Sequence, residues 1–187
     1  MKWVRVFKSS GEPLAVSMAG IKLGDRLLVV GCSNPVLIAR LAVKTGLTGR
    51  AMALDVRETL RARAADVAAR EGALIETATA PWTALPLDAN TFDVTVIHDV
   101  FSYLTAGERL GCVGEVQRVL RPGGRCLVID AVPRGGLGAL MHRRSSHPDY
   151  AATGGAVTLL QSAGLRAVRT LAERGGLVFV EAVKRNT

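Results

Sequence analysis

The sequence predicts an α/β fold with a mostly parallel sheet, and three observations carry this prediction. Four large aliphatic residues, Leu27–Val30, precede Gly31 and a helix start at Asn34, which is typical of a buried strand that turns directly into a helix. Strand-like apolar runs and amphipathic helical stretches then alternate along the chain. Near the end, two strand-like runs are separated by a hairpin-length turn at 173–176, which predicts a last strand antiparallel to its neighbour.

Length and composition indicate one domain, expected to cover residues 1–187. Of these residues 49% are hydrophobic and 4% aromatic, which suits the aliphatic interior of an α/β protein. No uncharged stretch reaches the length of a membrane span, and residues 1–20 lack the apolar core of a secretory signal. We therefore expect a cytoplasmic protein without a transmembrane segment.

The cysteines and the charge argue against two other kinds of site. Cys32, Cys112 and Cys126 are an odd number and form no Cys-x-x-Cys pair, so we expect reduced, mostly buried thiols and no metal site. The formal net charge is +8, but the basic residues are scattered along the chain. This distribution favours a solvated basic surface over nucleic-acid binding. Peripheral membrane contact and homo-oligomer formation stay open.

The first half of the chain predicts alternating strands and helices. Residues 1–10 are either a short strand or a segment packed on the body of the domain. The following elements are expected as helical turns over 13–19, strands over 26–30, 50–55 and 73–77, and helices from 35 and over 57–71. Asn34 and Pro35 are typical of a helix N-cap and a first helical position. A proline-containing loop follows over 78–90.

The second half continues this pattern. The expected elements are strands over 91–98, 125–130, 165–172 and 176–183, and a last helix over 150–163. Thr105 and Glu108 form a capping box. The helix that they begin should end at 121–124, and its buried stripe is expected at Leu110, Val113, Val116, Val119 and Leu120. Residues 131–149 form a long irregular connection, a kind of loop that is often functional.

Residues at the ends of three predicted strands are the first candidates for a ligand site. In open α/β sheets, ligands bind at the carboxyl ends of the strands, near the positive ends of the helices that follow. Gly31 follows the first strand, Asp55 ends the second, and His98 and Asp99 stand at the end of the fourth. We therefore expect these residues to share one crevice.

Several sequence blocks, taken in order, resemble the class I S-adenosylmethionine-dependent methyltransferases. The resemblance is strongest to the small-molecule enzymes related to ubiquinone and menaquinone biosynthesis. The matching blocks are the first strand and loop at 21–32, Asp55, the segments 85–87 and 90–94 before the fourth strand, and 119–124 before the fifth. Together they extend the resemblance over 21–184.

The resemblance implies a fold and an arrangement of the domain. The fold is a single Rossmann-like domain with a seven-stranded, mostly parallel sheet, an antiparallel last strand and helices on both faces. Residues 1–24 then form a short lead-in, and 131–149 form a loop near the acceptor.

The resemblance also implies S-adenosyl-L-methionine as the cofactor. Gly31 lets the ligand approach the backbone closely, and Asp55 accepts hydrogen bonds from both ribose hydroxyls. Trp82 either stacks on the adenine or serves only in packing. The expected cofactor-binding residues are Gly31, Cys32, Ser33, Asn34, Asp55, Val56, Pro81, Trp82 and His98.

His98 and Asp99 are the candidate catalytic residues. A neutral histidine at this position can remove a proton from a phenol or hydroxyl, although a histidine that only lines the cofactor site is the alternative. Tyr103, His142 and Arg143 are the candidate residues for a small-molecule acceptor. Together with Arg144 and His147, these residues could bind an anionic group of the acceptor. The alternative is an exposed loop whose charges have no such role.

The chain departs from the family's pattern at three places. Val29 stands where the family usually carries an acidic residue that holds the ligand's amino group. Ser33 and Pro35 replace the later glycines of the Gly-x-Gly-x-Gly pattern, and Pro81 stands where many members place an aspartate near the adenine amine. Each lost hydrogen bond is worth about 0.5–1.5 kcal/mol, so these departures predict weaker cofactor binding.

These observations leave several functions open. Methyl transfer to a small molecule follows from the ordered blocks, whereas the departures favour a catalytically silent methyltransferase-like module that binds a partner. Methylation of a macromolecule is a third hypothesis, but 97–100 lacks the Asn/Asp-Pro-Pro-Tyr-like motif of base amino-group methylation. A nicotinamide-dependent dehydrogenase would share the crevice and Asp55, yet 120–124 and the terminal hairpin fit a methyltransferase better.

Overall fold

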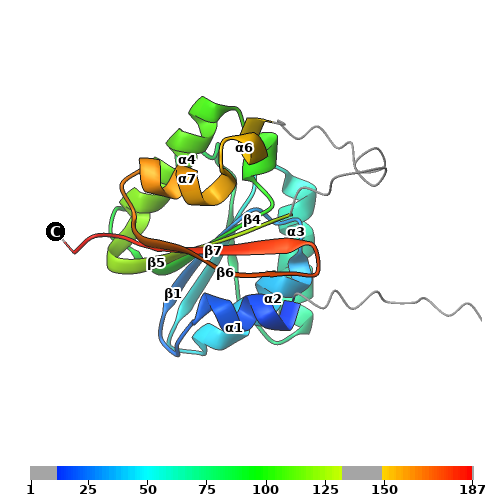
Figure 1. Ribbon diagram of the computed structural model, residues 1–187. Helices are drawn as coiled ribbons and strands as arrows, with labels where there is room; N and C mark the ends of the chain where they lie inside the picture. Colours follow the sequence, from blue (N-terminus) through cyan, green and yellow to red (C-terminus); the bar gives the residue numbers. More distant parts are fainter. Residues whose placement is uncertain (1–11, 132–148, 187) are drawn as a thin grey trace, which may run out of the picture.

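The computed structural model describes residues 12–131 and 149–186, and its centre is a seven-stranded sheet in the order β3-β2-β1-β4-β5-β7-β6 (Figure 1). The strands are β1 (Arg26–Val30), β2 (Arg50–Leu54), β3 (Glu76–Ala78), β4 (Phe92–His98), β5 (Leu120–Ala131), β6 (Arg166–Arg174) and β7 (Leu177–Val183). Strands β1 to β5 pair in parallel, and β7 runs antiparallel to both β5 and β6. The predicted mostly parallel sheet with an antiparallel last strand is confirmed.

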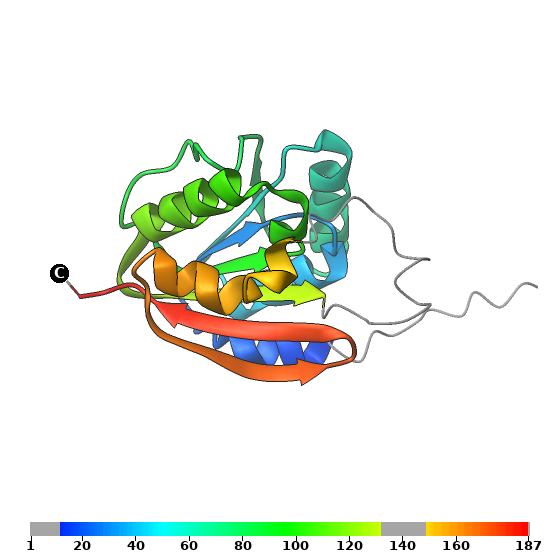
Figure 2. The same ribbon diagram turned by 45° about the horizontal axis from the view of Figure 1, so that its top comes forward.

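Helices cover both faces of this sheet (Figures 1 and 2). One face carries α1 (Glu12–Ala19), α2 (Pro35–Thr45) and α3 (Glu58–Arg70), and the other carries α4 (Ala106–Val119), α6 (Asp149–Ala152) and α7 (Gly155–Ser162). Successive strand residues point to opposite faces, so Val29 packs in the core beneath α2 while Leu28 packs in the core beneath α4. A strand buried on both faces needs an apolar residue at every position, which explains the uninterrupted run Leu27–Val30.

Two helix starts form as their local sequences predict. The Asn34 Oδ1 accepts a hydrogen bond from the Leu37 amide at 3.0 Å, and Pro35 is the first residue of α2. At α4, Thr105 and Glu108 form both halves of the capping box. Capping satisfies amides that the helix itself leaves unpaired, so these short motifs set the start of each helix without help from distant residues.

The structure corrects three of the expected elements. The third strand is β3 at Glu76–Ala78 instead of 73–77, and β5 begins at Leu120 instead of 125. The segment 121–124 is extended because it pairs with the end of the chain: the Gly123 amide donates to the Lys184 carbonyl at 3.1 Å, and the Lys184 amide donates to the Gly124 carbonyl at 2.9 Å. The expected helix over 150–163 is divided into α6 and α7.

The break between α6 and α7 has a backbone cause. Gly154 and Gly155 have φ values of +90° and +57°, which a continuing right-handed helix does not allow. Leu110, expected in the buried stripe of α4, is 50% exposed, so that stripe is narrower than predicted. Other expected boundaries differ by one or two residues.

Two expectations from composition can be compared with the structure. The three cysteines are buried and form no disulfide, as predicted. Within 12–131 and 149–186, none of the helices is long and apolar enough to cross a membrane. The expectations for residues 1–10 and for the interior of the 131–149 connection lie outside the described residues.

Candidate functional site

Asp55 lies directly after β2, and its side chain has no exposed surface. Its Oδ2 accepts hydrogen bonds from the Cys32 amide at 2.8 Å and from Arg57 Nη2 at 2.9 Å. Its Oδ1 accepts from the Arg57 amide and from Arg57 Nε, both at 2.9 Å. Burial alone would raise the pKa of Asp55, but the hydrogen bonds from Arg57 and Cys32 hold it below its ordinary value. Asp55 is therefore an ionised carboxylate at neutral pH.

Gly31 lies in the turn after β1 with φ at +97°. A Cβ atom at this position would lie 2.4 Å from the His98 carbonyl oxygen and 2.7 Å from Val100 Cγ2. The space beside Gly31 is thus filled by the chain that leaves β4. A glycine is required here because the two strand ends approach each other closely, a reason that differs from the expected approach of a ligand.

His98 ends β4 and contacts the turn after β1. Its Nδ1 lies 2.9 Å from the Ser33 hydroxyl oxygen, within hydrogen-bond distance. Burial lowers the pKa of His98 to about 4, so its imidazole is neutral at neutral pH.

A pocket of about 240 Å³ opens beside Asp55. It is lined by Val56, Arg57, Trp82, Asp99, Val100 and Tyr103. Four of these residues were predicted from the sequence as site residues, and the structure brings them together: Val56, Trp82, Asp99 and Tyr103. Apolar walls from Val56 and Trp82 beside the carboxylate of Asp99 suit a flat ring that carries polar groups.

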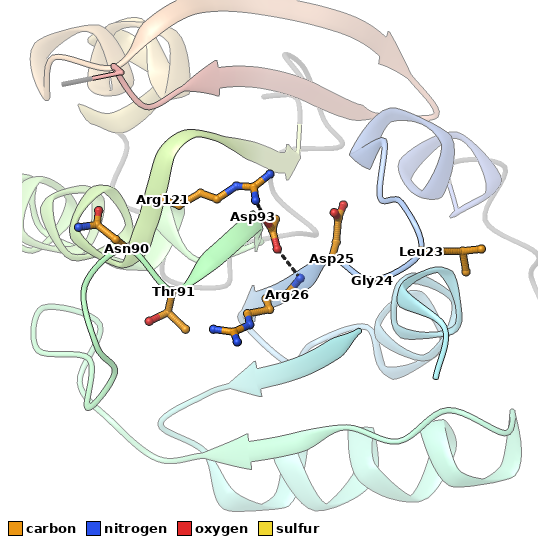
Figure 3. A pocket seen from close by; sticks show the side chains of 8 residues that line it. All are labelled: Leu23, Gly24, Asp25, Arg26, Asn90, Thr91, Asp93 and Arg121. Atoms are coloured by element: carbon orange, nitrogen blue, oxygen red, sulfur yellow. Dashed lines mark hydrogen bonds and ion pairs between the residues drawn. The ribbon is translucent and has the colours of Figure 1, made fainter. Parts of the chain in front are cut away.

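A larger cavity of about 460 Å³ lies at the opposite edge of the sheet, between the segments before β1 and β4 (Figure 3). Its lining includes Asp93, which forms an ion pair with Arg121 and accepts a hydrogen bond from the Arg26 amide at 2.6 Å. These contacts tie the amino ends of the strands together. Parallel α/β sheets bind their ligands at the other, carboxyl edge, so we assign the site to the smaller pocket.

Comparison with known families decides the classification of the chain. A family model described as a methyltransferase domain matches residues 28–128, more than half of the chain. This chain belongs to the methyltransferase domain family. The matched region begins in β1 and ends in β5, so it contains the strand ends that carry Gly31, Asp55 and His98.

Two curated methyltransferases share part of this sequence. A ubiquinone/menaquinone biosynthesis C-methyltransferase of Teredinibacter turnerae is 28% identical over 121 residues, covering 64% of this chain and 48% of that protein. A chloroplastic 2-phytyl-1,4-beta-naphthoquinone methyltransferase of Arabidopsis thaliana is 31% identical over 129 residues, covering 63% and 46%. The chain spans about half the length of these curated relatives.

Solved structures share the fold over nearly the whole chain. A SAM-dependent methyltransferase of Aquifex aeolicus has a TM-score of 0.73 at 22% identity, covering 92% of this chain and 88% of that chain. The [4+2]-cyclase SpnF has a TM-score of 0.74 at 18% identity, covering 96% and 82%. At these identities the likeness shows the class I methyltransferase fold, and the cyclase illustrates that one fold carries more than one activity.

Three of the four positions that depart from the methyltransferase pattern have contacts or roles within the fold. Val29 is buried in the core beneath α2, the Ser33 hydroxyl lies 2.9 Å from His98 Nδ1, and Pro35 is the first residue of α2. Pro81 is exposed and is not among the residues that line the pocket. The predicted acceptor residues His142 and Arg143, with Arg144 and His147, lie outside the described residues.

Two features near these strand ends were not predicted from the sequence. The first is Arg57, which joins Asp55 in the site. An arginine two residues after a strand-end carboxylate is a usable signal, because the start of the next helix folds it back toward that carboxylate.

The second feature is a buried polar cluster around Asp130, near the end of β5. The Tyr150 hydroxyl donates to Asp130 Oδ2 at 2.6 Å, while Asp130 Oδ1 has no hydrogen-bond partner among the residues that the structure describes. The Arg109 guanidinium lies 4.8 Å from the centre of the Tyr150 ring. The pKa of Asp130 is raised to about 7, mainly by burial and in smaller part by the charge of Asp99, against the hydrogen bond from Tyr150 and the charge of Arg109. Like Asp55, this carboxylate stands near the end of a strand, which is the signal that could have found it.

Proposed function

We propose that this chain transfers a methyl group from S-adenosylmethionine to a small-molecule acceptor, at oxygen, carbon or nitrogen. The observation that carries the proposal is the ionised, fully buried Asp55 after β2, set beside the pocket of Val56 and Trp82. A carboxylate in this position can accept hydrogen bonds from two neighbouring ribose hydroxyls through its two oxygens.

The residues of the site fit this cofactor. Asp55 already accepts one hydrogen bond on each oxygen from the paired nitrogens of Arg57, so its orientation suits a ligand that offers two donors side by side. We propose that Asp55 holds the ribose, that Val56 and Trp82 flank the adenine, and that the turn Cys32–Asn34 contacts the amino-acid part. When bound, S-adenosylmethionine supplies a methyl group on a sulfonium that leaves readily.

Positioning supplies much of the catalysis for such a transfer, because a direct displacement needs its two reacting groups in line. Asp99 and Tyr103 line the pocket from the β4 side and are the proposed contacts for the acceptor. We keep His98 as the proposed proton acceptor for a hydroxyl or phenol. Its lowered pKa makes it a weak base, so proton removal would accompany methyl transfer and would not precede it.

The names of the two curated relatives suggest where to search for the acceptor. The names of both relatives refer to quinones, so we propose reduced, hydroxyl-bearing aromatic rings as the first acceptors to test. A ring of this kind can lie against apolar and aromatic side chains while its hydroxyl reaches a polar group.

Calorimetric titration with S-adenosylmethionine and S-adenosylhomocysteine tests the cofactor part of the proposal. We expect saturable binding of both, and folded protein that binds neither would contradict the proposal. Mass spectrometry of reactions with a panel of hydroquinones, phenols and amines then tests transfer through the appearance of S-adenosylhomocysteine and a methylated product. Binding without transfer to any acceptor would instead support a silent, partner-binding methyltransferase-like module.

A further inference from the structure

We infer that Arg57 determines ligand specificity at this site, because its guanidinium occupies the positions on Asp55 that a ligand's neighbouring hydroxyls would take. This inference rests on the proposed function, since it concerns the same carboxylate. It predicts that the chain weakens its own binding of ribose-containing ligands.

The hydrogen bonds on Asp55 leave no room for an additional pair of donors. Each carboxylate oxygen accepts one backbone amide, from Cys32 or from Arg57 itself, and one side-chain nitrogen of Arg57. A carboxylate oxygen has two lone pairs, so both oxygens are saturated. Two ribose hydroxyls can bind Asp55 only if they replace the two guanidinium nitrogens.

The two partners of this ion pair differ in their freedom to move. The Asp55 side chain is 0% exposed, whereas the Arg57 side chain is 50% exposed and lines the pocket. Arg57 can therefore turn toward solvent while its backbone amide keeps its bond to Asp55. Asp55 cannot follow, because the Cys32 amide holds it against the turn after β1.

The ion pair between Arg57 and Asp55 weakens the binding of some ligands and not of others. A ligand with two neighbouring hydroxyls must break the paired contact between Arg57 and Asp55, whereas a ligand without them can occupy the pocket with the contact intact. Partly exposed ion pairs contribute little and paired arginine–carboxylate contacts somewhat more, so the expected penalty is about three- to tenfold in affinity.

Calorimetric titration of Arg57→Ala and the wild type tests this inference. The ligands are S-adenosylhomocysteine and adenosine, which carry the two hydroxyls, and 2′,3′-dideoxyadenosine, which lacks them. Titration at about pH 8 keeps Asp55 ionised in both proteins. We expect Arg57→Ala to bind the first two ligands about three- to tenfold more tightly and the third with unchanged affinity.

Two further variants distinguish the effect of the paired contact from the effect of losing a positive charge and from an effect on folding. Arg63→Ala removes the same charge from an exposed position on α3 and should leave all three affinities unchanged. Arg57→Gln keeps most of the side-chain length without the paired donors and should also tighten binding, which secures the test if Arg57→Ala folds poorly by circular dichroism.

The results divide as follows. Wild type that binds S-adenosylhomocysteine while both Arg57 variants bind it no tighter would overturn the inference and leave the proposed function standing. Tighter binding that extends to dideoxyadenosine, or that Arg63→Ala shares, would also overturn it. Folded proteins that all fail to bind S-adenosylhomocysteine would remove the proposed function, and the inference with it.

Discussion

Asp55 is held by groups that come from one strand end and one helix start. The Cys32 amide lies after β1, Asp55 after β2, and Arg57 at the N-cap of α3. Because each of these contacts donates a hydrogen bond to the carboxylate, the site stabilises a negative charge in a fully buried position. The negative charge that these hydrogen bonds stabilise also makes Asp55 a strong acceptor of hydrogen bonds from a ligand.

Replacing Asp55 with asparagine tests this role. We expect Asp55→Asn to bind S-adenosylhomocysteine about 10- to 100-fold more weakly, because hydrogen bonds to a charged group are worth about 1.5–3 kcal/mol. Calorimetric titration measures the change, and Asp66→Asn on the exposed side of α3 is the matched control. Equal affinities for Asp55→Asn and the wild type would contradict a role for Asp55 in cofactor binding.

Gly31 allows a second test at the scale of one residue. The new Cβ of Gly31→Ala would lie 2.4 Å from the His98 carbonyl oxygen, and the residue would also carry a positive φ. We expect a loss of about 2–4 kcal/mol in the free energy of unfolding, measured by chemical denaturation.

Gly72→Ala is the control for Gly31→Ala. Gly72 also has a positive φ, at +75°, but an added Cβ would meet no atom of the described residues within 4 Å. It should cost only about 1–2 kcal/mol, the price of the backbone conformation. Equal losses in the two variants would show that the contact with His98 contributes nothing.

At the scale of elements, Glu181 connects three strands and one helix. It lies on β7, is 5% exposed, and forms ion pairs with Arg125 of β5 and Arg169 of β6. Arg125 also donates to the carbonyls of Met18 and Gly20 at the end of α1. These contacts attach α1 and the terminal hairpin to the parallel part of the sheet.

Glu181→Ala should therefore destabilise the fold more than the loss of an exposed ion pair. Both arginines can regain water, so we expect a loss of about 1–3 kcal/mol in the free energy of unfolding near neutral pH. The control is Glu76→Ala, which breaks the half-exposed pair with Arg50 and should cost at most about 1 kcal/mol. Chemical denaturation of the two variants compares these costs, and a larger loss for Glu76→Ala would refute this role.

The stabilising effect of Glu181 also has a predicted pH range. Burial alone would raise the pKa of Glu181, but the hydrogen bonds from Arg169 and Arg125 hold it below its ordinary value of 4.5. Its contribution is therefore present above pH 4.5 and is lost as the pH falls through the lower value of the folded state.

At the scale of the whole molecule, one buried acid has the opposite effect on the pH dependence of stability. Asp130 has its pKa raised to about 7 by burial, and it faces Tyr150 from α6, Asp99 from the end of β4 and Arg109 from α4. The folded state binds this proton more tightly than the unfolded chain does. Stability from Asp130 is therefore complete at low pH and is lost as the pH rises from about 4 toward about 7.

Asp130→Asn should remove this pH dependence. Between about pH 5 and 7 the wild type should lose up to about 1.4 kcal/mol of unfolding free energy per pH unit through Asp130, and the variant should not. Denaturant midpoints measured across that range give the comparison. Parallel pH profiles for the two proteins would show that Asp130 does not titrate in this range.

The local sequence was sufficient for most of the fold. The apolar run before Gly31, the caps at Asn34 and Thr105, and the hairpin near the end each depend on residues close together in the chain. Each formed as predicted, except that the hairpin turn is shorter, at 175–176 instead of 173–176. The division of α6 from α7 was missed because Gly154 and Gly155 were interpreted as parts of a continuous helix. The start of β5 was missed because the pairing that extends it is not local: Leu120 pairs with Phe92 of β4, and Gly123 and Gly124 bond to Lys184, about sixty residues away.

For the site, the sequence by itself determined which strand ends carry polar groups, so Asp55, His98 and Asp99 were predicted from their positions. Only the tertiary structure decided what those groups contact: Arg57 on Asp55, Ser33 on His98, and the chain after β4 against Gly31. Position along a strand follows from local periodicity. The contacts and the charge of a buried side chain depend on which distant segments the sheet brings together and on how completely they exclude water.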